Sequence, residues 1–391
     1  MSVYPLTGVV RPYAWGSRTI LAKLQGRPVP SDGPEAELWL GAHPGDPSTV
    51  SRPDGPISLA TLIAEDPKGQ LGSEVAGEFG SRLPYLMKVL AAEAPLSLQA
   101  HPDAEYARRA FAAQEADPAA PRNYTDPFHK PEMLVALTPF RALCGFRAPE
   151  MSAAVLDELD LPRLAPVVAA LRAGVPGLRD AVRTLLAWPT EDRRPLVDAV
   201  VAAARSRPTS SYALAAELAG HYPGDPGVLV ALLLNHVRLE PGEAIWMPAG
   251  NMHAYLNGAA VEIMASSDNV LRGGFTPKRV DVDELLRVLR FEVLDEPVLP
   301  AVEVASGVVT WEVPAREFAL YRIRLDGATQ PIVVPGQGPR ILIGTEGDVE
   351  ISADDGGSVR VRTGAAAFAP ADAGTITVAG GGEVFVATVP E

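Results

Sequence analysis

The segment from Gly242 to Asn257 constrains the fold of this chain more than any other. It reads Gly-Glu-Ala-Ile-Trp-Met-Pro-Ala-Gly-Asn-Met-His-Ala-Tyr-Leu-Asn. Pro248 and Gly250 predict a turn between two short strands, and the second strand then presents His253 and Tyr255 on one face. In a small β-barrel that face is the interior. A lone imidazole there is more often a hydrogen-bonded core side chain than a metal ligand, so a ligand role needs support from other residues.

The spacing of five residues in this segment resembles the second metal-binding motif of the cupin superfamily, G-x5-P-x-G-x2-H-x3-N. Each of the five positions is matched, beginning at Gly242 and ending at Asn257. The resemblance implies a jelly-roll barrel in which His253 is a metal-bound imidazole. The four further matches favour the ligand interpretation of His253 over the core interpretation.

A second segment offers partners for a metal ion. Between Leu96 and Asp103 polar residues alternate with apolar ones, which places Ser97, Gln99 and His101 on one side of a strand. That side is a candidate ligand face. The preceding run from Pro84 to Leu90 is also strand-like, and we expect the two strands to form a hairpin.

A third segment, His-Lys-Pro-Glu-Met at residues 129–133, supplies a carboxylate. With it the chain offers two imidazole nitrogens and two side-chain oxygens, a set that suits zinc and leaves room for water or a substrate oxygen. The glutamine is neutral, so a bound dication would keep a net positive charge and act as a Lewis acid. We therefore predict one Zn²⁺ per chain, although manganese and cobalt accept the same donors, with these ligands: Gln99, His101, Glu132 and His253.

The overall composition limits the class of partner. The chain has 391 residues, a net charge of −14 and an isoelectric point near 5.0, which argues against nucleic acid or an anionic membrane as the main partner. The first residues lack a basic segment followed by an apolar core, and no run of about eighteen apolar residues occurs. We expect a cytoplasmic protein that binds a small molecule. We also expect a monomer, and a dimer stays open.

Lysine is rare and unevenly placed in this chain. Only five of the 34 basic side chains are lysine. Three of them, Lys88, Lys130 and Lys278, fall inside the three motif-bearing segments when the last is extended to residue 279, where an even distribution would place about one. An ammonium donates to phosphate or to sugar hydroxyls as a compact point charge. We therefore expect these lysines at the site, with a solvated loop charge as an equal alternative for Lys278.

Composition shifts predict a mainly β protein with an inserted helical region. After about residue 149 apolar residues recur at spacings of three and four, as at Leu164, Val167, Val168 and Leu171, which predicts four or five helices. Beyond residue 291 the chain returns to Val, Ile and Thr strands with Gly-rich turns, typical of a second jelly roll without metal. We expect a catalytic cupin domain of residues 1–148 and 237–290, a helical insertion of residues 149–236, and a C-terminal jelly roll of residues 291–391.

Charged side chains inside apolar runs are candidate catalytic groups. Glu262 lies between Val261 and Ile263, so its side chain faces away from theirs and is expected to point into the cavity. Arg272 precedes two glycines, which allow the chain to approach a ligand closely. Near the N-terminus, Trp15 is either a wall of a sugar pocket or a core aromatic residue.

Taken together, these residues resemble the type I phosphomannose isomerase family, and the resemblance covers most of the chain. The segment from His253 to Lys278 matches one family signature with a single departure, Gly273 in place of alanine. The segment from Tyr124 to Glu132 matches a second signature with Phe128 in place of asparagine. Neither departure touches a predicted ligand, although the second can alter how the next two residues are held.

The resemblance implies a reaction and roles for particular residues. The family interconverts mannose 6-phosphate and fructose 6-phosphate by moving a proton between C2 and C1 through a cis-enediol. It implies the four zinc ligands given above and makes Arg272 the catalytic arginine. We expect the base to be a carboxylate whose pKa is raised by burial, with Glu262 first and Asp268 and His101 behind it. The expected catalytic residues are Arg272, Glu262, Lys130 and Asp268, and the expected substrate-binding residues are Trp15, Lys88, Ser97, Tyr255 and Lys278.

Two other functions stay open from the residues alone. A different cupin metalloenzyme, acting on another sugar or with iron or manganese, would use a similar metal face. Such sites usually carry two histidines as H-x-H, where this chain has Gln99 before His101. A non-catalytic cupin that binds sugar phosphate would be favoured by the loss of a ligand or of Arg272, and none is lost.

Overall fold

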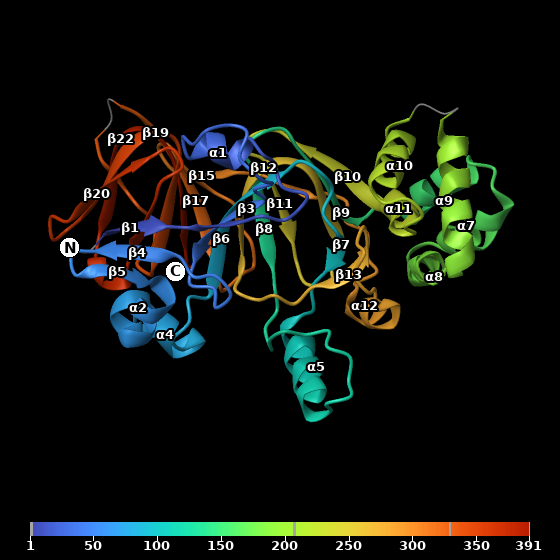
Figure 1. The fold of residues 1–391 in the computed structure, drawn as a ribbon, viewed down its shortest axis with the longest axis horizontal. Helices are drawn as coiled ribbons and strands as arrows, with labels where there is room; N and C mark the ends of the chain where they lie inside the picture. The colour runs from blue at the N-terminus through green and yellow to red at the C-terminus, as the bar shows by residue number, and fades with distance from the viewer. Residues whose placement is uncertain (1–2, 206–208, 328–329, 391) are drawn as a thin grey trace.

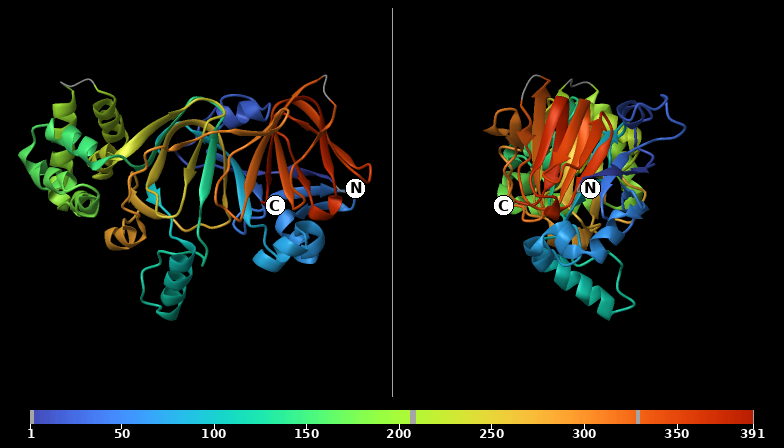
Figure 2. Two further views of the ribbon diagram at one scale, coloured as in Figure 1. Left: turned by 180° about the vertical axis from the view of Figure 1, so that it is seen from behind. Right: turned by 90° about the vertical axis from the view of Figure 1, so that its left-hand side faces the viewer.

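The computed structural model describes residues 3–205, 209–327 and 330–390. Within these residues the protein is mainly β, with two 11-stranded sheets and a group of helices at one end (Figure 1). Figure 2 shows the helices and the C-terminal strands at opposite ends of an elongated molecule, with the other strands between them. The predicted class, a mainly β protein with an α insertion, is confirmed.

The first sheet is organised around the long strand β12 (His253–Ala265). Twelve of its 13 residues are buried, because neighbouring elements cover both of its faces. Its C-terminal part pairs with β6 (Tyr85–Ala92) and β8 (Glu132–Ala136), and its first residues pair with β7 (Leu98–Ala100) and β9 (Phe140–Phe146). The other strands of this sheet are β2 (Val9–Arg11), β3 (Glu37–Gly41), β10 (Leu234–Leu239), β11 (Ala244–Met247), β13 (Leu271–Gly274) and β14 (Val298–Leu299).

The expected hairpin between the runs at 84–90 and 96–101 is wrong. β6 pairs with β3 and β12, whereas β7 pairs with β12 and β13. The reason is the length of β12, which lies beside both strands: β6 follows its C-terminal part, while Gln99 of β7 lies opposite His253 at its start. The alternation of residues predicted the strands correctly, but a strand distant in the sequence decided their pairing.

The second sheet contains the C-terminal strands together with three strands from the N-terminal region. β1 (Tyr4–Thr7) pairs with β21 (Ala366–Ala369) and with β4 (Thr49–Arg52), which pairs with β5 (Gly55–Ser58). A boundary at residue 291 would therefore separate strands that share hydrogen bonds, and the domain limits stay a prediction. The remaining strands are β15 (Val302–Ala305), β16 (Val308–Thr310), β17 (Ala319–Asp326), β18 (Ile332–Val333), β19 (Arg340–Ala353), β20 (Ser358–Arg362) and β22 (Ile376–Thr388).

Helices fill the region between β9 and β10, as the spacing of apolar residues predicts. The four residues that carried the prediction, from Leu164 to Leu171, are all buried in its core. The described residues hold six α-helices here rather than four or five, since α11 is a four-residue turn too short for a periodicity argument. They are α6 (Pro149–Asp157), α7 (Ala165–Arg172), α8 (Val175–Leu186), α9 (Thr190–Ala204), α10 (Ser210–His221) and α11 (Gly227–Val230).

A helix outside the insertion, α5 (Ala104–Ala116), follows Asp103 directly. The Asp103 carboxylate begins it by accepting the backbone N–H of Tyr106 over 2.8 Å. Among the described residues, no helix is both long and apolar enough to cross a membrane. The other helices outside the insertion are α1 (Ile20–Leu24), α2 (Leu59–Glu65), α3 (Pro67–Leu71), α4 (Ser73–Phe79) and α12 (Val282–Val288).

One apolar core joins the two sheets. Met87 of the first sheet belongs to the same buried cluster as Phe368 of the second. Beside it, the Tyr85 hydroxyl lies 2.9 Å from the carbonyl oxygen of Pro339 and 3.0 Å from that of Ala387. The Tyr85 proton is thus shared between two acceptors of the C-terminal region, and it links β6 to that region.

Tyr85→Phe should lower the free energy of unfolding by about 1–2 kcal/mol, because it keeps the ring but leaves two buried carbonyl oxygens without this donor. Urea titration followed by tryptophan fluorescence measures the change. Tyr13→Phe is the matched control, since its side chain is 37% exposed and its hydroxyl only accepts from Arg11. If Tyr85→Phe unfolds at the wild-type urea concentration, the hydroxyl does not help to hold the two regions together.

Candidate metal centre and active site

The fold brings the predicted ligands to one place. His253 opens β12 opposite Gln99 of β7, Glu132 opens β8 beside the same strand, and His101 follows β7 directly. His253 Nε2 lies 3.2 Å from Glu132 Oε2 and 3.3 Å from Gln99 Nε2. His101 Nε2 lies 3.4 Å from Glu132 Oε1. The side chain of Gln99 can present its oxygen here instead, because the two ends of an amide have the same shape.

Hydrogen bonds behind the two imidazoles fix their protons. His101 Nδ1 lies 2.7 Å from the carbonyl oxygen of Asn269, and His253 Nδ1 lies 3.1 Å from that of Asn251. A carbonyl oxygen only accepts, so each Nδ1 carries the proton and each Nε2 presents a lone pair to the cluster. Orientation of the ring by a backbone carbonyl is typical of metal-binding histidines.

In the resulting cluster, the lone pairs of the two imidazole nitrogens face the lone pairs of the Glu132 carboxylate. His101, Glu132 and His253 are buried, and their candidate ligand atoms all lie within 4.8 Å of one another. Among the described residues, His101 Nε2 and Glu132 Oε2 have no hydrogen-bond partner. Two imidazole lone pairs that face a carboxylate in a dry site are unfavourable unless a cation lies between them. The residues present therefore fit a zinc ion, with two nitrogen ligands and oxygen ligands from Glu132 and Gln99.

Burial and neighbouring charges give His101 and Glu132 the protonation states that a metal requires. Burial lowers the pKa of His101 to about 4, so its imidazole is neutral near pH 7. Burial alone would raise the pKa of Glu132, but the Lys130 ammonium and His101 hold it well below its usual value. Lys130 Nζ lies 2.9 Å from Glu132 Oε1, so this lysine contacts the cluster directly.

A cavity of about 790 Å³ gives access to the cluster, since Gln99 and Glu132 form part of its wall. This volume is within the range of small-molecule sites. Trp15 and Lys278, for which the sequence allows either a site position or an ordinary structural one, both line the cavity. The same wall contains all the other residues expected in catalysis or substrate binding: Lys88, Ser97, Lys130, Tyr255, Glu262, Asp268 and Arg272.

Glu262 is a buried carboxylate with two polar partners in this wall. Tyr255 donates its hydroxyl proton to Glu262 Oε1 over 2.6 Å, and Lys88 Nζ lies 3.2 Å from Oε2. Burial raises the pKa of Glu262, and the Lys88 ammonium partly opposes that rise. The residues on either side, Val261 and Ile263, lie in the apolar core between the sheets, so strand alternation directs Glu262 into the cavity as predicted.

Glu37 and His43 line the cavity, although sequence analysis did not place them there. Glu37 accepts the indole N–H of Trp39 over 2.7 Å and lies 3.4 Å from Lys88 Nζ, so the lysine is held between two carboxylates. His43 Nε2 lies 3.3 Å from Asp268 Oδ2. The sequence did contain an indication that Glu37 is functional, since it is a carboxylate at the start of an apolar strand. It contained none for His43, because this residue lies outside the strands and only the fold brings it to the site.

Arg272 is a half-buried cation that no carboxylate of the described residues neutralises. It lies on β13, opposite Gln99 of β7, and so beside the metal cluster. Burial lowers its pKa, and no carboxylate in the described part of the chain contributes to that shift. Its N–H groups are therefore available to a negatively charged oxygen in the cavity.

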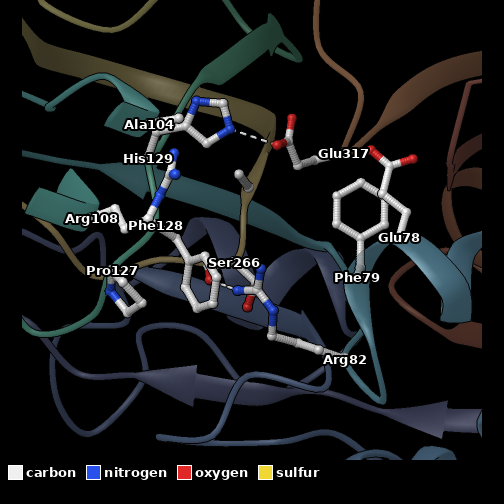
Figure 3. A pocket seen from close by; sticks show the side chains of 11 residues that line it. Glu78, Phe79, Arg82, Ala104, Arg108, Pro127, Phe128, His129, Ser266 and Glu317 are labelled. Atoms are coloured by element: carbon white, nitrogen blue, oxygen red, sulfur yellow. Dashed lines mark hydrogen bonds and ion pairs between the residues drawn. The ribbon is translucent and has the colours of Figure 1, made fainter. Parts of the chain in front are cut away.

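Phe128 and His129 face a separate pocket of about 340 Å³ (Figure 3). His129 Nε2 lies 2.5 Å from Glu317 Oε1, and the centre of the Phe128 ring lies 3.6 Å from the Arg82 guanidinium. The next residue, Lys130, contacts the metal cluster instead. The phenylalanine that departs from the family signature thus packs against an arginine outside the active-site cavity, and the ligand face is intact.

The fold and the site define a metalloprotein in which two histidines and a carboxylate from different strands meet beside a cavity. Residues 3–149 match the family model described as phosphomannose isomerase type I, catalytic domain. Mannose-6-phosphate isomerase from Salmonella typhimurium is 37% identical over 393 residues, with 97% of each chain covered. Mannose-6-phosphate isomerase from Schizosaccharomyces pombe is 32% identical, with 95% of each chain covered. The chain belongs to the type I phosphomannose isomerase family.

Solved structures agree with this assignment. A zinc-bound mannose 6-phosphate isomerase matches with a TM-score of 0.91 and 33% identity over the full length of both chains. A variant of phosphomannose isomerase from Salmonella typhimurium also matches with a TM-score of 0.91, at 34% identity. The predicted cupin fold is confirmed, and zinc as the metal is supported both by this neighbour and by the ligand cluster.

Removal of zinc should lower the melting temperature, because a ligand that binds only the folded state adds about 2.7 kcal/mol at a hundred times its dissociation constant. Calorimetry of metal-free and zinc-loaded protein measures this difference. Glu132→Gln should reduce both the difference and the zinc content. Glu317→Gln, in the separate pocket, is the control and should respond like the wild type. A full response to zinc in Glu132→Gln would contradict a ligand role for Glu132.

Proposed function

We propose that the protein is a zinc-dependent aldose–ketose isomerase that interconverts mannose 6-phosphate and fructose 6-phosphate through a cis-enediol. The observation that supports this most is one cavity whose wall contains Gln99 and Glu132 of the ligand cluster, the buried carboxylate of Glu262, and Arg272, which no carboxylate of the described residues neutralises. The curated relatives that share most of their length with this chain carry this activity in their names.

The difficult step is the removal of a proton from a carbon beside a carbonyl, because the negative charge must be held on an enediolate oxygen. Bound zinc supplies Lewis-acid stabilisation of such charge. Arg272 adds N–H donors from a fixed place in the wall, beside Gln99. Lys130 and Lys88, both buried, bring further positive charge to the cavity and donate to sugar oxygens.

Glu262 is the first candidate for the group that carries the proton between the two carbons. Burial raises its pKa toward the range where a carboxylate exchanges protons efficiently, and Tyr255 and Lys88 hold its two oxygens in place. Asp268 is the second candidate. Its side chain is 51% exposed and its hydrogen bond with His43 lowers its pKa, so it is a weaker base. His101 is displaced from this role because its Nε2 faces the metal cluster.

Trp15, Ser97 and Lys278 complete the wall for the substrate. Trp15 stacks on Tyr13 with ring centroids 5.8 Å apart, which gives an apolar plate for the carbon face of a sugar. Lys278, at the rim, supplies charge for the phosphate. A local group of cations is necessary because the chain as a whole carries a net charge of −14 and repels anions.

We also propose the domain division into residues 1–148 with 237–290, 149–236 and 291–391, and activity of a single chain in the cytoplasm. One chain supplies every residue given a role here, so the site does not require a second copy. A sugar phosphate is charged and does not cross a lipid bilayer unaided, so an enzyme that uses it is expected in the compartment where the substrate is made.

The zinc-loaded protein should produce fructose 6-phosphate from mannose 6-phosphate, and chelation should abolish turnover until zinc is restored. A coupled assay through glucose 6-phosphate measures the rate. Binding of mannose 6-phosphate without turnover would instead favour a non-catalytic binding protein. Turnover restricted to a different sugar phosphate would favour another cupin enzyme.

Arg272→Ala should reduce kcat/KM by about 10²–10³-fold, because one fixed donor to the developing oxyanion is lost. Zinc content should stay near that of the wild type, since Arg272 is not a proposed ligand. Arg163→Ala, an exposed arginine of the helical insertion, is the control and should leave both quantities unchanged. Wild-type turnover in Arg272→Ala would remove this arginine from the mechanism.

The activity should fall as pH decreases through the raised pKa of Glu262, because a base acts only when ionised. Lys88→Met should move this acidic limb of the kcat/KM profile to higher pH, since the ammonium stabilises the ionised carboxylate. Profiles of both proteins over the same pH range measure the shift. If the base is Asp268, whose pKa is lowered, the limb lies below the ordinary value for an aspartate.

A further inference from the structure

One corner of the helical insertion reaches the active-site cavity. Tyr222, which follows α10, lines the cavity beside the segment 275–278, which contains Lys278. Asp225 lies in the turn between α10 and α11, with its backbone N–H bonded to the carbonyl oxygen of Tyr222 over 3.1 Å. Figure 1 shows α10 and α11 on the side of the helical group that faces the first sheet. Nothing in the sequence motifs marks this corner as part of the site.

Asp225 binds the backbone of the segment 275–278 directly; this segment is the rim segment of the cavity. Its Oδ2 accepts the N–H of Phe275 over 2.7 Å and that of Thr276 over 3.4 Å. Its Oδ1 accepts the N–H of Gly227 over 2.7 Å. One carboxylate of the insertion therefore ties the start of α11 to the segment that follows β13. Charge-assisted bonds of this kind are stronger than bonds between neutral groups.

The rim segment has a backbone conformation that needs such support. Phe275 has φ of +55°, in the left-handed region that a bulky side chain rarely adopts. Strained conformations persist only where the surroundings determine them, and they concentrate at functional sites. Thr276 also restricts the backbone of this segment, because its Oγ1 accepts the backbone N–H of Lys278 over 3.1 Å. The position of Lys278 is thereby linked to Asp225 through two hydrogen bonds.

Close packing and aromatic contact hold the same corner. A Cβ added at Gly274 would lie 2.8 Å from the Cα of Gly227, so the two backbones approach as only glycines allow. The Tyr222 ring stacks on the Phe275 ring with centroids 5.3 Å apart. The Tyr222 hydroxyl donates to the carbonyl oxygen of Pro95 over 2.6 Å, in the loop that leads to β7. Tyr222 therefore joins two parts of the cavity rim.

We propose that Asp225 and Tyr222 are positioning residues, which hold the segment 275–278 so that Lys278 meets the phosphate end of the substrate. The inference rests on the proposed isomerase function. The proposal gives the helical insertion a part in substrate binding. The insertion holds the segment 275–278, which lies at the rim of the cavity, away from the reacting carbons. Loss of these contacts should therefore weaken substrate binding more than it slows the chemical step.

Asp225→Asn is the principal test, because it keeps the size of the side chain and removes its charge. KM for mannose 6-phosphate should rise about tenfold while kcat changes less than about twofold, the pattern of a lost binding interaction. Inhibition by inorganic phosphate should weaken in parallel. Asp198→Asn, on the exposed face of α9, is the matched control and should behave like the wild type. An unchanged KM in Asp225→Asn overturns the proposal.

Hydrogen exchange of the backbone provides a readout that does not depend on turnover. Peptides that cover residues 274–278 should exchange faster in Asp225→Asn than in Asp198→Asn. Inorganic phosphate should slow their exchange in the wild type and have a smaller effect in Asp225→Asn. If phosphate protects the segment equally in both proteins, or in neither, Asp225 does not position a phosphate site. A wild-type protein that lacks turnover but shows the expected protection would defeat the proposed reaction and leave this inference standing.

Tyr222→Phe is the second variant, because it keeps the stacked ring and removes only the bond to Pro95. We expect a rise in KM of about two- to threefold, with zinc content unchanged. Should Asp225→Asn fail to fold, this variant and its exchange pattern decide the question. A loss of kcat and of zinc together, in either variant, would indicate a general structural role and contradict the positioning role.

Discussion

Three buried ligand groups that face one another with no proton between them are the constraint on which the rest of this structure depends. His101 and His253 both commit their Nδ1 protons to backbone carbonyls, so their Nε2 lone pairs turn toward the Glu132 carboxylate. Such an arrangement costs free energy unless a cation occupies the centre. Folding of the first sheet and binding of zinc are therefore coupled, because the arrangement of β7, β8 and β12 creates the cluster and the ion stabilises that arrangement.

Around this centre, buried cations and carboxylates lie in contact with one another. Lys88 lies between Glu37 and Glu262, and Lys130 lies against Glu132. Pairing is necessary for these groups because they are buried, and an isolated charge would change its protonation state instead. Arg272 is the exception, since no described carboxylate neutralises it. Its N–H donors are therefore open to an anionic oxygen in the cavity.

The sequence predicted those parts of the site that are marked by patterns of neighbouring residues, and missed those that depend on contacts between distant segments. His253 and the Gln99 face were found because turn residues and period-two alternation are local, and a local pattern survives whatever the tertiary structure becomes. Glu262 was placed correctly by the same argument, and Glu37 carried that signal without being recognised. His43 and Asp225 carried none, because both lie in turns whose function depends entirely on what the fold brings next to them. The prediction of a hairpin between β6 and β7 was wrong, because each strand can pair with any other strand of the chain and not only with its neighbour in the sequence.

By itself, the sequence determined the residue types at the candidate metal site, the strands that carry them, the mainly β class and the location of the helices, because side-chain chemistry and residue spacing do not depend on distant parts of the chain. The tertiary structure decided which strands are neighbours. It joined three N-terminal strands to the C-terminal sheet and set Gln99 opposite His253 across β12. It also brought the turn with Asp225 against the rim of the cavity. These outcomes depend on the free energy of packing between segments far apart in the chain. The spacing of residues within one segment carries no information about that free energy.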